Sequence, residues 1–116
     1  MKKIYFVNGF LEAGKTTFVK ELLSQDYFDT GEKTLVLLCE DGSEEYTDVF
    51  CREHHLTVEI IEDEDTFTDE KLKEVEERIN PERIIIEFNG MWNPEHKLDY
   101  WSEEQIMMIE IIDATT

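Results

Sequence analysis

The chain of 116 residues is long enough for one small domain, and 41% of its residues are hydrophobic, which allows a buried core. Its 29 acidic and 11 basic residues give a formal net charge of −18. Nucleic acids and anionic membranes need a basic surface, so neither is an expected partner. Most of the acidic side chains are interpreted as a solvated surface.

Apolar runs and helical patterns alternate along the chain. Residues 3–8 predict a first buried strand. The helix after it is predicted by an apolar stripe with spacing i, i+1, i+4 and i+5, which consists of Phe18, Val19, Leu22 and Leu23. Further strands are predicted at residues 35–39, 58–61, 84–88 and 106–112.

Two more helices are expected between these strands. Ser43 is the expected N-cap of a short helix around residues 46–50, with acidic residues in its first turn. Thr68 is expected to cap a longer helix, which the pair Asn80-Pro81 ends. The apolar face of this longer helix consists of Leu72, Val75 and Ile79.

Strands that are apolar throughout and alternate with helices are typical of a parallel sheet covered on both faces. We therefore predict an α/β fold with three layers and a mainly parallel sheet. Ligands of such folds bind at the carboxyl ends of the strands. Four acidic residues lie at predicted strand ends and should share that edge of the sheet: Glu40, Asp41, Glu87 and Asp113.

The strongest motif is the phosphate-binding pattern G-x-x-x-x-G-K-[ST], which residues 9–16 match. It comes directly after an apolar run and directly before a helical pattern, which is the context that such a loop requires. A glycine turn that only joined a strand to a helix would not explain the lysine and threonine at its end. The motif therefore predicts that the chain binds a nucleoside triphosphate.

The backbone of this loop is expected to surround the phosphates. Gly9 and Gly14 allow the chain to pass close to them. The backbone N–H groups from about Glu12 and Ala13 to Thr17 would form a nest for anions. The helix that begins near Gly14 adds its positive N-terminal end.

The side chains at the end of the motif have separate predicted roles. Lys15 should reach the β- and γ-phosphates, and Thr16 should place its hydroxyl on Mg²⁺. Thr17 is placed to reach the α-phosphate.

Magnesium on a nucleotide usually takes one or two carboxylates, directly or through water. Glu87 follows an apolar triplet, as the acid of a Walker B strand does. Glu40 and Asp41 follow the second predicted strand, where a switch-type metal ligand would lie. The predicted metal ligands are therefore Thr16, Glu40, Asp41 and Glu87.

Residues 9–17 resemble the signature G-F-L-G-A-G-K-T-T of the CobW/HypB/UreG class of P-loop GTPases, with Glu12 in place of a glycine. Three further segments resemble the family's N-E-x-G segment, its E-x-x-G…P segment and its V-V-D-A strand end: Glu40 with Gly42, residues 86–90 with Pro94, and residues 111–114. The resemblance covers nearly the whole chain.

This resemblance implies a GTP-binding domain that serves metal-cofactor assembly, with ATP as the alternative nucleotide. The family's base-reading [NT]-K-x-D motif and its C-x-C-C metal motif are absent from the 116 residues. We interpret residues 1–116 as the N-terminal part of a CobW-like nucleotide-binding domain that is incomplete at its C-terminus.

Slow, magnesium-dependent GTP hydrolysis is the first functional hypothesis. Lys15 and Mg²⁺ would neutralise charge on the γ-phosphate, while Glu87 or an acid near Asp41 would position the attacking water. The alternative is a nucleotide-gated binding module without significant turnover, which would serve a metalloprotein or a permease. A third hypothesis, an ATP-dependent small-molecule kinase, would need a substrate-binding insertion that the sequence does not show.

Two groups containing a cysteine are candidate transition-metal ligands: Cys39 with Glu40 and Asp41, and Cys51 with His54 and His55. Tetrahedral zinc needs three or four ligands, and neither group supplies a convincing set. We therefore expect Mg²⁺ to be the only specifically bound ion.

The two cysteines are too few for a disulfide framework, and Cys39 is expected to be a buried thiol in a reducing compartment. The sequence shows no apolar run long enough to insert into a membrane, so a cytoplasmic protein is expected. An uncovered edge of the predicted sheet would favour self-association.

Overall fold

The computed structural model describes residues 2–8, 15–25, 31–39, 46–88 and 101–110, with only the backbone at 15, 16, 103 and 110. The described part contains one five-stranded sheet with the order β3-β2-β4-β1-β5. Its strands are β1 (Lys3–Asn8), β2 (Thr34–Leu38), β3 (Leu56–Ile60), β4 (Arg83–Glu87) and β5 (Ile106–Glu110). Every neighbouring pair is parallel, as the sequence predicts.

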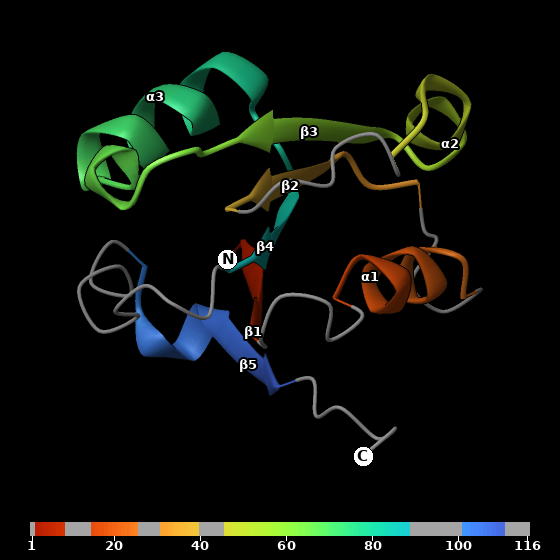
Figure 1. The fold of residues 1–116 in the computed structure, drawn as a ribbon, viewed down its shortest axis with the longest axis horizontal. Helices are drawn as coiled ribbons and strands as arrows, with labels where there is room; N and C mark the ends of the chain where they lie inside the picture. The colour runs from red at the N-terminus through yellow and green to blue at the C-terminus, as the bar shows by residue number, and fades with distance from the viewer. Residues whose placement is uncertain (1, 9–14, 26–30, 40–45, 89–100, 111–116) are drawn as a thin grey trace.

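The helices form a layer on each side of this sheet (Figure 1). The α-helices are α1 (Lys15–Leu23), α2 (Asp48–Glu53) and α3 (Asp69–Ile79). The described part also contains two 3₁₀ turns, η2 (Glu64–Thr66) and η4 (Glu103–Gln105). Side chains of α1 and α2 join one apolar cluster with one face of the sheet. Side chains of α3 join a second cluster with the other face. The structure therefore confirms the three-layer α/β architecture.

The handedness of parallel crossovers explains this division of the helices. The chain moves in one direction along the sheet from β1 to β2 and on to β3, and then returns from β3 to β4. Crossovers between parallel strands are almost always right-handed, so reversing the direction places the connecting helix on the opposite face. For this reason α3 covers the face that α1 and α2 leave open.

The central strands are buried along their whole length. All residues of β2 and β4 are buried, which fits strands covered on both faces. At the edge of the sheet, β5 exposes Met107 (57%) and Met108 (50%). The expected self-association remains a prediction, and β5 is the edge that would carry it.

The sequence places most element boundaries within one or two residues. The predicted strand 58–61 begins earlier, at Leu56, and residues 111–112 of the last predicted strand lie outside the described part of the chain. The short helix was predicted too early: α2 begins at Asp48, and its N-cap is Thr47, whose side chain accepts a hydrogen bond from the Phe50 N–H. Ser43 lies outside the described residues.

The longer helix, α3, begins and ends as predicted. The Thr68 hydroxyl accepts a hydrogen bond from the Lys71 N–H (3.2 Å), and Asn80 ends the helix in the left-handed conformation with φ 52°. The buried residues of this helix are Leu72, Val75 and Ile79. Because Asn tolerates positive φ and Pro cannot continue a helix, Asn80-Pro81 is an effective stop.

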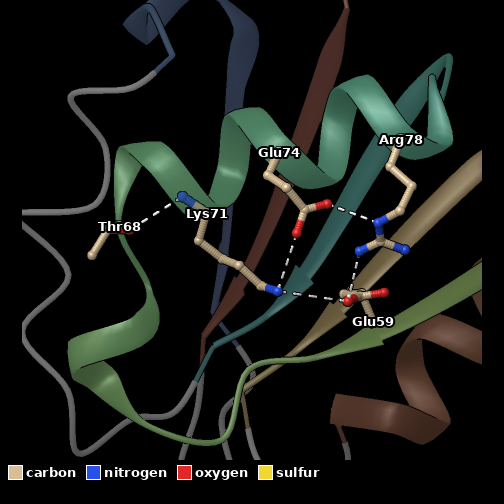
Figure 2. Close-up of polar contacts among 5 residues, drawn as sticks. All are labelled: Glu59, Thr68, Lys71, Glu74 and Arg78. Atoms are coloured by element: carbon tan, nitrogen blue, oxygen red, sulfur yellow. Dashed lines mark hydrogen bonds and ion pairs between the residues drawn. The ribbon is translucent and has the colours of Figure 1, made fainter.

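Ion pairs join the outer side of α3 to β3 (Figure 2). Arg78 donates from Nε to Glu74 Oε2 (2.7 Å) and from Nη2 to Glu59 Oε1 (2.9 Å). Lys71 Nζ lies 3.5 Å from Glu74 Oε1 and 3.9 Å from Glu59 Oε1. The hydrogen bond from Arg78 is the main cause that lowers the pKa of Glu74, followed by the charges of Arg78 and Lys71.

The substitution Arg78→Gln should lower stability slightly at neutral pH and not at all in acid. The pKa of Glu74 is lowered in the folded state, so its contribution is present above the pKa of the unfolded chain and is lost as pH falls through the folded value. Urea unfolding from about pH 7 to about pH 3 would test this. The control is Arg52→Gln on α2, and a pH-independent effect of Arg78→Gln would contradict the prediction.

Candidate functional site

The phosphate-binding motif lies between a strand and a helix of the structure. Strand β1 ends at Asn8, directly before the motif, and α1 begins at Lys15, inside it. The first turn of α1 contains no acidic residue, so no carboxylate there offsets the positive end of the helix dipole. This arrangement is the strand–loop–helix context that the sequence predicts.

Most predicted phosphate ligands lie outside the described residues or are described only by their backbone. Gly9, Glu12, Ala13 and Gly14 are outside the described residues, and Lys15 and Thr16 are described only as backbone of α1. The Thr17 side chain is exposed in the first turn of this helix. The roles assigned to these residues remain predictions.

The strand order places the motif beside β4. Strands β1 and β4 are neighbours, but the chain continues from β1 to β2 on one side of the pair and from β4 to β5 on the other. In open parallel sheets, ligands bind at the carboxyl ends of strands where the direction of winding changes. The carboxyl ends of β1 and β4 are therefore the expected binding edge.

Glu87 is the buried acid at this edge. It is the last residue of β4, lies in register with Val7 of β1 and Leu38 of β2, and is only 4% exposed. Side chains alternate along a strand, so Glu87 shares the face of Ile85, which packs with α1 and α2. The predicted Walker B acid therefore lies on the strand next to β1, beside the carboxyl end of β1.

A tyrosine holds the Glu87 carboxylate. The Tyr46 hydroxyl donates a hydrogen bond to Glu87 Oε2, and Tyr46 itself is only 6% exposed. The sequence pattern predicts only that Tyr46 lies in a short helix. It does not reveal the contact with Glu87. A buried tyrosine hydroxyl usually finds a partner, which was the available signal. A partner 41 residues away in the chain cannot be identified from that signal.

The helix that follows Tyr46 is itself packed against α1. The Tyr46 and Phe50 rings lie 6.2 Å apart, and Lys20 Nζ of α1 lies 5.2 Å from the centre of the Phe50 ring. Cys51 Sγ approaches the Tyr46 carbonyl oxygen at 3.9 Å. A continuous set of contacts therefore joins the helix of the phosphate-binding motif to the Glu87 carboxylate.

The other predicted carboxylates, Glu40, Asp41 and Asp113, lie outside the described residues. Trp101 is buried in the cluster beneath α3.

Of the two cysteine groups, Cys51 with His54 and His55 lies entirely within the described residues. Within the described ranges, no three His, Cys, Asp or Glu residues could together hold a metal ion. Cys39 is buried, as the sequence predicts. Burial, followed by the charge of Asp48, raises the pKa of the Cys51 thiol and disfavours the thiolate that would bind zinc.

Comparison with known proteins identifies the class. Residues 3–116 match the model of the family described as CobW/HypB/UreG, nucleotide-binding domain. The chain is therefore a P-loop nucleotide-binding domain. It belongs to the CobW/HypB/UreG family, as the resemblance of its motifs predicts. No protein of curated function matches the chain in sequence.

One similar solved structure is the crystal structure of FlhF complexed with GMPPNP and Mg²⁺. The TM-score is 0.60 with 16% sequence identity, and the match covers 94% of this chain and 44% of that chain. At this identity the likeness shows the fold alone, which is the predicted P-loop fold. The chain spans less than half the length of that structure.

In the described part of the chain, no helix is both long and apolar enough to cross a membrane.

The substitution Tyr46→Phe should destabilise the fold by about 1–3 kcal/mol, because it removes a donor from a buried carboxylate oxygen. Urea unfolding at neutral pH would measure it. Tyr5→Phe, which removes a half-buried hydroxyl from β1, is the matched control. An effect of Tyr46→Phe no larger than that of Tyr5→Phe would contradict the prediction.

We also expect the purified protein to contain no stoichiometric zinc or cobalt. Burial raises the pKa of the Cys51 thiol, and neither cysteine group supplies the number of ligands that a tight site needs. Elemental analysis of protein purified without chelator would measure the metal content. About one equivalent of metal that Cys39→Ser or Cys51→Ser removes would contradict this expectation.

Proposed function

We propose that the chain binds GTP with Mg²⁺ and hydrolyses it slowly. The observation that carries this proposal is the position of Glu87. A buried carboxylate ends the strand beside β1, and β1 leads directly into the P-loop motif of a member of this family. A buried acid is costly unless it has partners, so its place at this edge supports a role in binding.

The residues at this edge fit a magnesium nucleotide. Carboxylate and hydroxyl oxygens are the ligands that Mg²⁺ prefers. Glu87 supplies a carboxylate at the carboxyl end of β4, and the motif supplies Thr16 at the start of α1. We propose Thr16, Glu40, Asp41 and Glu87 as the residues that hold the ion directly or through water.

The chain's own groups would bind and orient the nucleotide. Thr16 and the proposed carboxylates would hold Mg²⁺, which would supply positive charge beside the phosphates. Lys15 would bind the same phosphates, and the N–H groups of Glu12 to Thr17, near the N-terminus of α1, would surround them. Glu87, or an acid near Asp41, would hold the water that attacks the γ-phosphate. Catalysis by positioning with one cationic side chain is consistent with a slow rate.

The guanine base and the cellular role are proposed from the family. The family model covers residues 3–116, and the similar FlhF structure contains GMPPNP, an analogue of GTP. These findings favour GTP over ATP. A role in metal-cofactor assembly, with a metalloprotein or a permease as partner, rests on family membership alone.

Lys15→Ala should abolish GTP hydrolysis and weaken binding of the triphosphate at least tenfold, because it removes the cation assigned to the phosphates. Phosphate release and equilibrium binding with GTP and ATP would be measured in the presence of Mg²⁺. The matched control is Lys33→Ala, which removes an exposed lysine just before β2, at the amino ends of the strands.

Three results separate the functional hypotheses. Equal hydrolysis by Lys15→Ala and the parent would refute the assigned role. Tight GTP binding without phosphate release over hours would favour the nucleotide-gated binding module. Preference for ATP would overturn the proposed base specificity.

A further inference from the structure

The contact between Tyr46 and Glu87 joins two distant parts of the chain at the proposed nucleotide site. Tyr46 comes directly before the Thr47 cap of α2, and Glu87 is the last residue of β4. Both side chains are buried. The energy of a buried carboxylate depends strongly on its donors, because water no longer stabilises the charge. The hydroxyl of Tyr46 therefore helps to determine the direction in which Glu87 points.

The surroundings of Tyr46 restrict where this hydroxyl can lie. The ring packs 6.2 Å from Phe50 with an interplanar angle of 53°. The Thr47 hydroxyl caps α2 by accepting a hydrogen bond from the Phe50 N–H (3.2 Å). The Cys51 N–H donates to the Thr47 carbonyl oxygen (2.9 Å). The backbone next to Tyr46 is thus part of a capped helix and not of an isolated turn.

The same helix contacts the helix of the phosphate-binding motif. Lys20 of α1 lies over the Phe50 ring at 5.2 Å from its centre, and Phe50 stacks against His54 with the ring centres 4.4 Å apart. Lys20 is five residues after Lys15, the first residue of α1. Tyr46 is therefore supported by both helices that cover this face of the sheet.

The contact is made to one oxygen of the carboxylate. Tyr46 donates to Oε2 of Glu87. The two oxygens of a carboxylate lie in one rigid plane, so a hydrogen bond that holds one of them also restricts the direction of the other.

We propose that Tyr46 is a positioning residue of the magnesium–nucleotide site, which holds Oε2 of Glu87 and so fixes the direction of this carboxylate. This inference rests on the proposed function and extends it to a residue outside the phosphate-binding motif. Tyr46 touches neither phosphate nor metal in this role; it acts through Glu87.

The test measures how strongly Mg²⁺ supports binding of GMPPNP, which is not hydrolysed. Tyr46→Phe should raise the Mg²⁺ concentration for half-maximal binding about tenfold, the effect expected for losing one hydrogen bond to a charged group. Its affinity for GMPPNP in excess chelator should stay within about twofold of the parent, since the phosphate loop is unchanged.

Two controls isolate the contribution of the hydroxyl. Tyr5→Phe removes a half-buried phenol from β1 on the same face of the sheet and should leave the Mg²⁺ dependence unchanged. In a Glu87→Gln background, Tyr46→Phe should have no further effect on the Mg²⁺ dependence, because the two residues act as a unit. If Tyr46→Phe changed the Mg²⁺ dependence equally in the parent and in the Glu87→Gln protein, the inference would be overturned.

The direction of the change is also decisive. If the Tyr46 hydroxyl instead blocked the carboxylate, its removal would lower the Mg²⁺ requirement, and that result would overturn a positioning role. An equal loss of affinity with and without Mg²⁺ would also overturn it, because such a loss indicates general damage to the fold.

A measurement on the nucleotide-free protein separates this inference from the proposed function. The carboxyl ¹³C resonance of Glu87, assigned by Glu87→Gln, should shift in Tyr46→Phe and stay in place in Tyr5→Phe; no shift in Tyr46→Phe would overturn the inference. A parent protein without Mg²⁺-dependent GMPPNP binding would refute the proposed function and the inference with it. A parent that binds, together with a Tyr46→Phe variant of equal Mg²⁺ dependence, would refute the inference alone.

Discussion

The burial of β2 and β4 on both faces is the constraint on which the rest of the structure depends. Every residue of these two strands is buried. Polar groups in such strands must find partners within the protein, and they can do so most easily at the strand ends. Within β2 and β4, the buried polar or charged residues are Thr34, Arg83 and Glu87, and all three lie at a strand end.

The buried polar side chains at the two ends of β4 find their hydrogen-bond partners in different parts of the fold. At the amino end, Arg83 Nε donates to the Thr34 hydroxyl (2.6 Å), so a neighbouring strand supplies the partner. At the carboxyl end, Glu87 accepts a hydrogen bond from Tyr46, which follows residues 40–45 and lies outside the sheet. A bond within the sheet is fixed once the strands pair. A bond to a residue outside the sheet depends on where α2 packs on the sheet.

The net charge of −18 makes local organisation at this edge important. A triphosphate carries negative charge and must approach a chain with a large excess of acids. Long-range attraction is therefore weak or unfavourable, and short-range donors must supply the binding energy. The start of α1 suits this purpose, because its first turn has no acidic residue and its backbone N–H groups point out of the helix. Placing a carboxylate nearby is favourable only when a cation accompanies the nucleotide.

The sequence was sufficient to predict most of the fold because the signals were local. Continuous apolar runs gave the strands, and Thr68 and Asn80 marked the two ends of α3. The start of α2 is misplaced because Ser43 and Thr47 are both good cap residues, and the local sequence does not decide between them. Glu87 could be predicted because it directly follows an apolar strand. The Tyr46 contact could not, because it joins two residues that are 41 positions apart in the chain, and no local pattern encodes such a pairing.

These features together explain why one hydrogen bond connects the fold with the proposed function. The motif fixes α1, α1 packs on α2 through Lys20 and Phe50, and α2 places Tyr46 against Glu87. The hydrophobic pattern alone would allow these helices to pack on the sheet in many arrangements. The polar pair selects among them, since a buried carboxylate without its donor costs more than a small loss of apolar packing. The residue that orients the proposed magnesium ligand is therefore also one that specifies how α2 packs on the sheet.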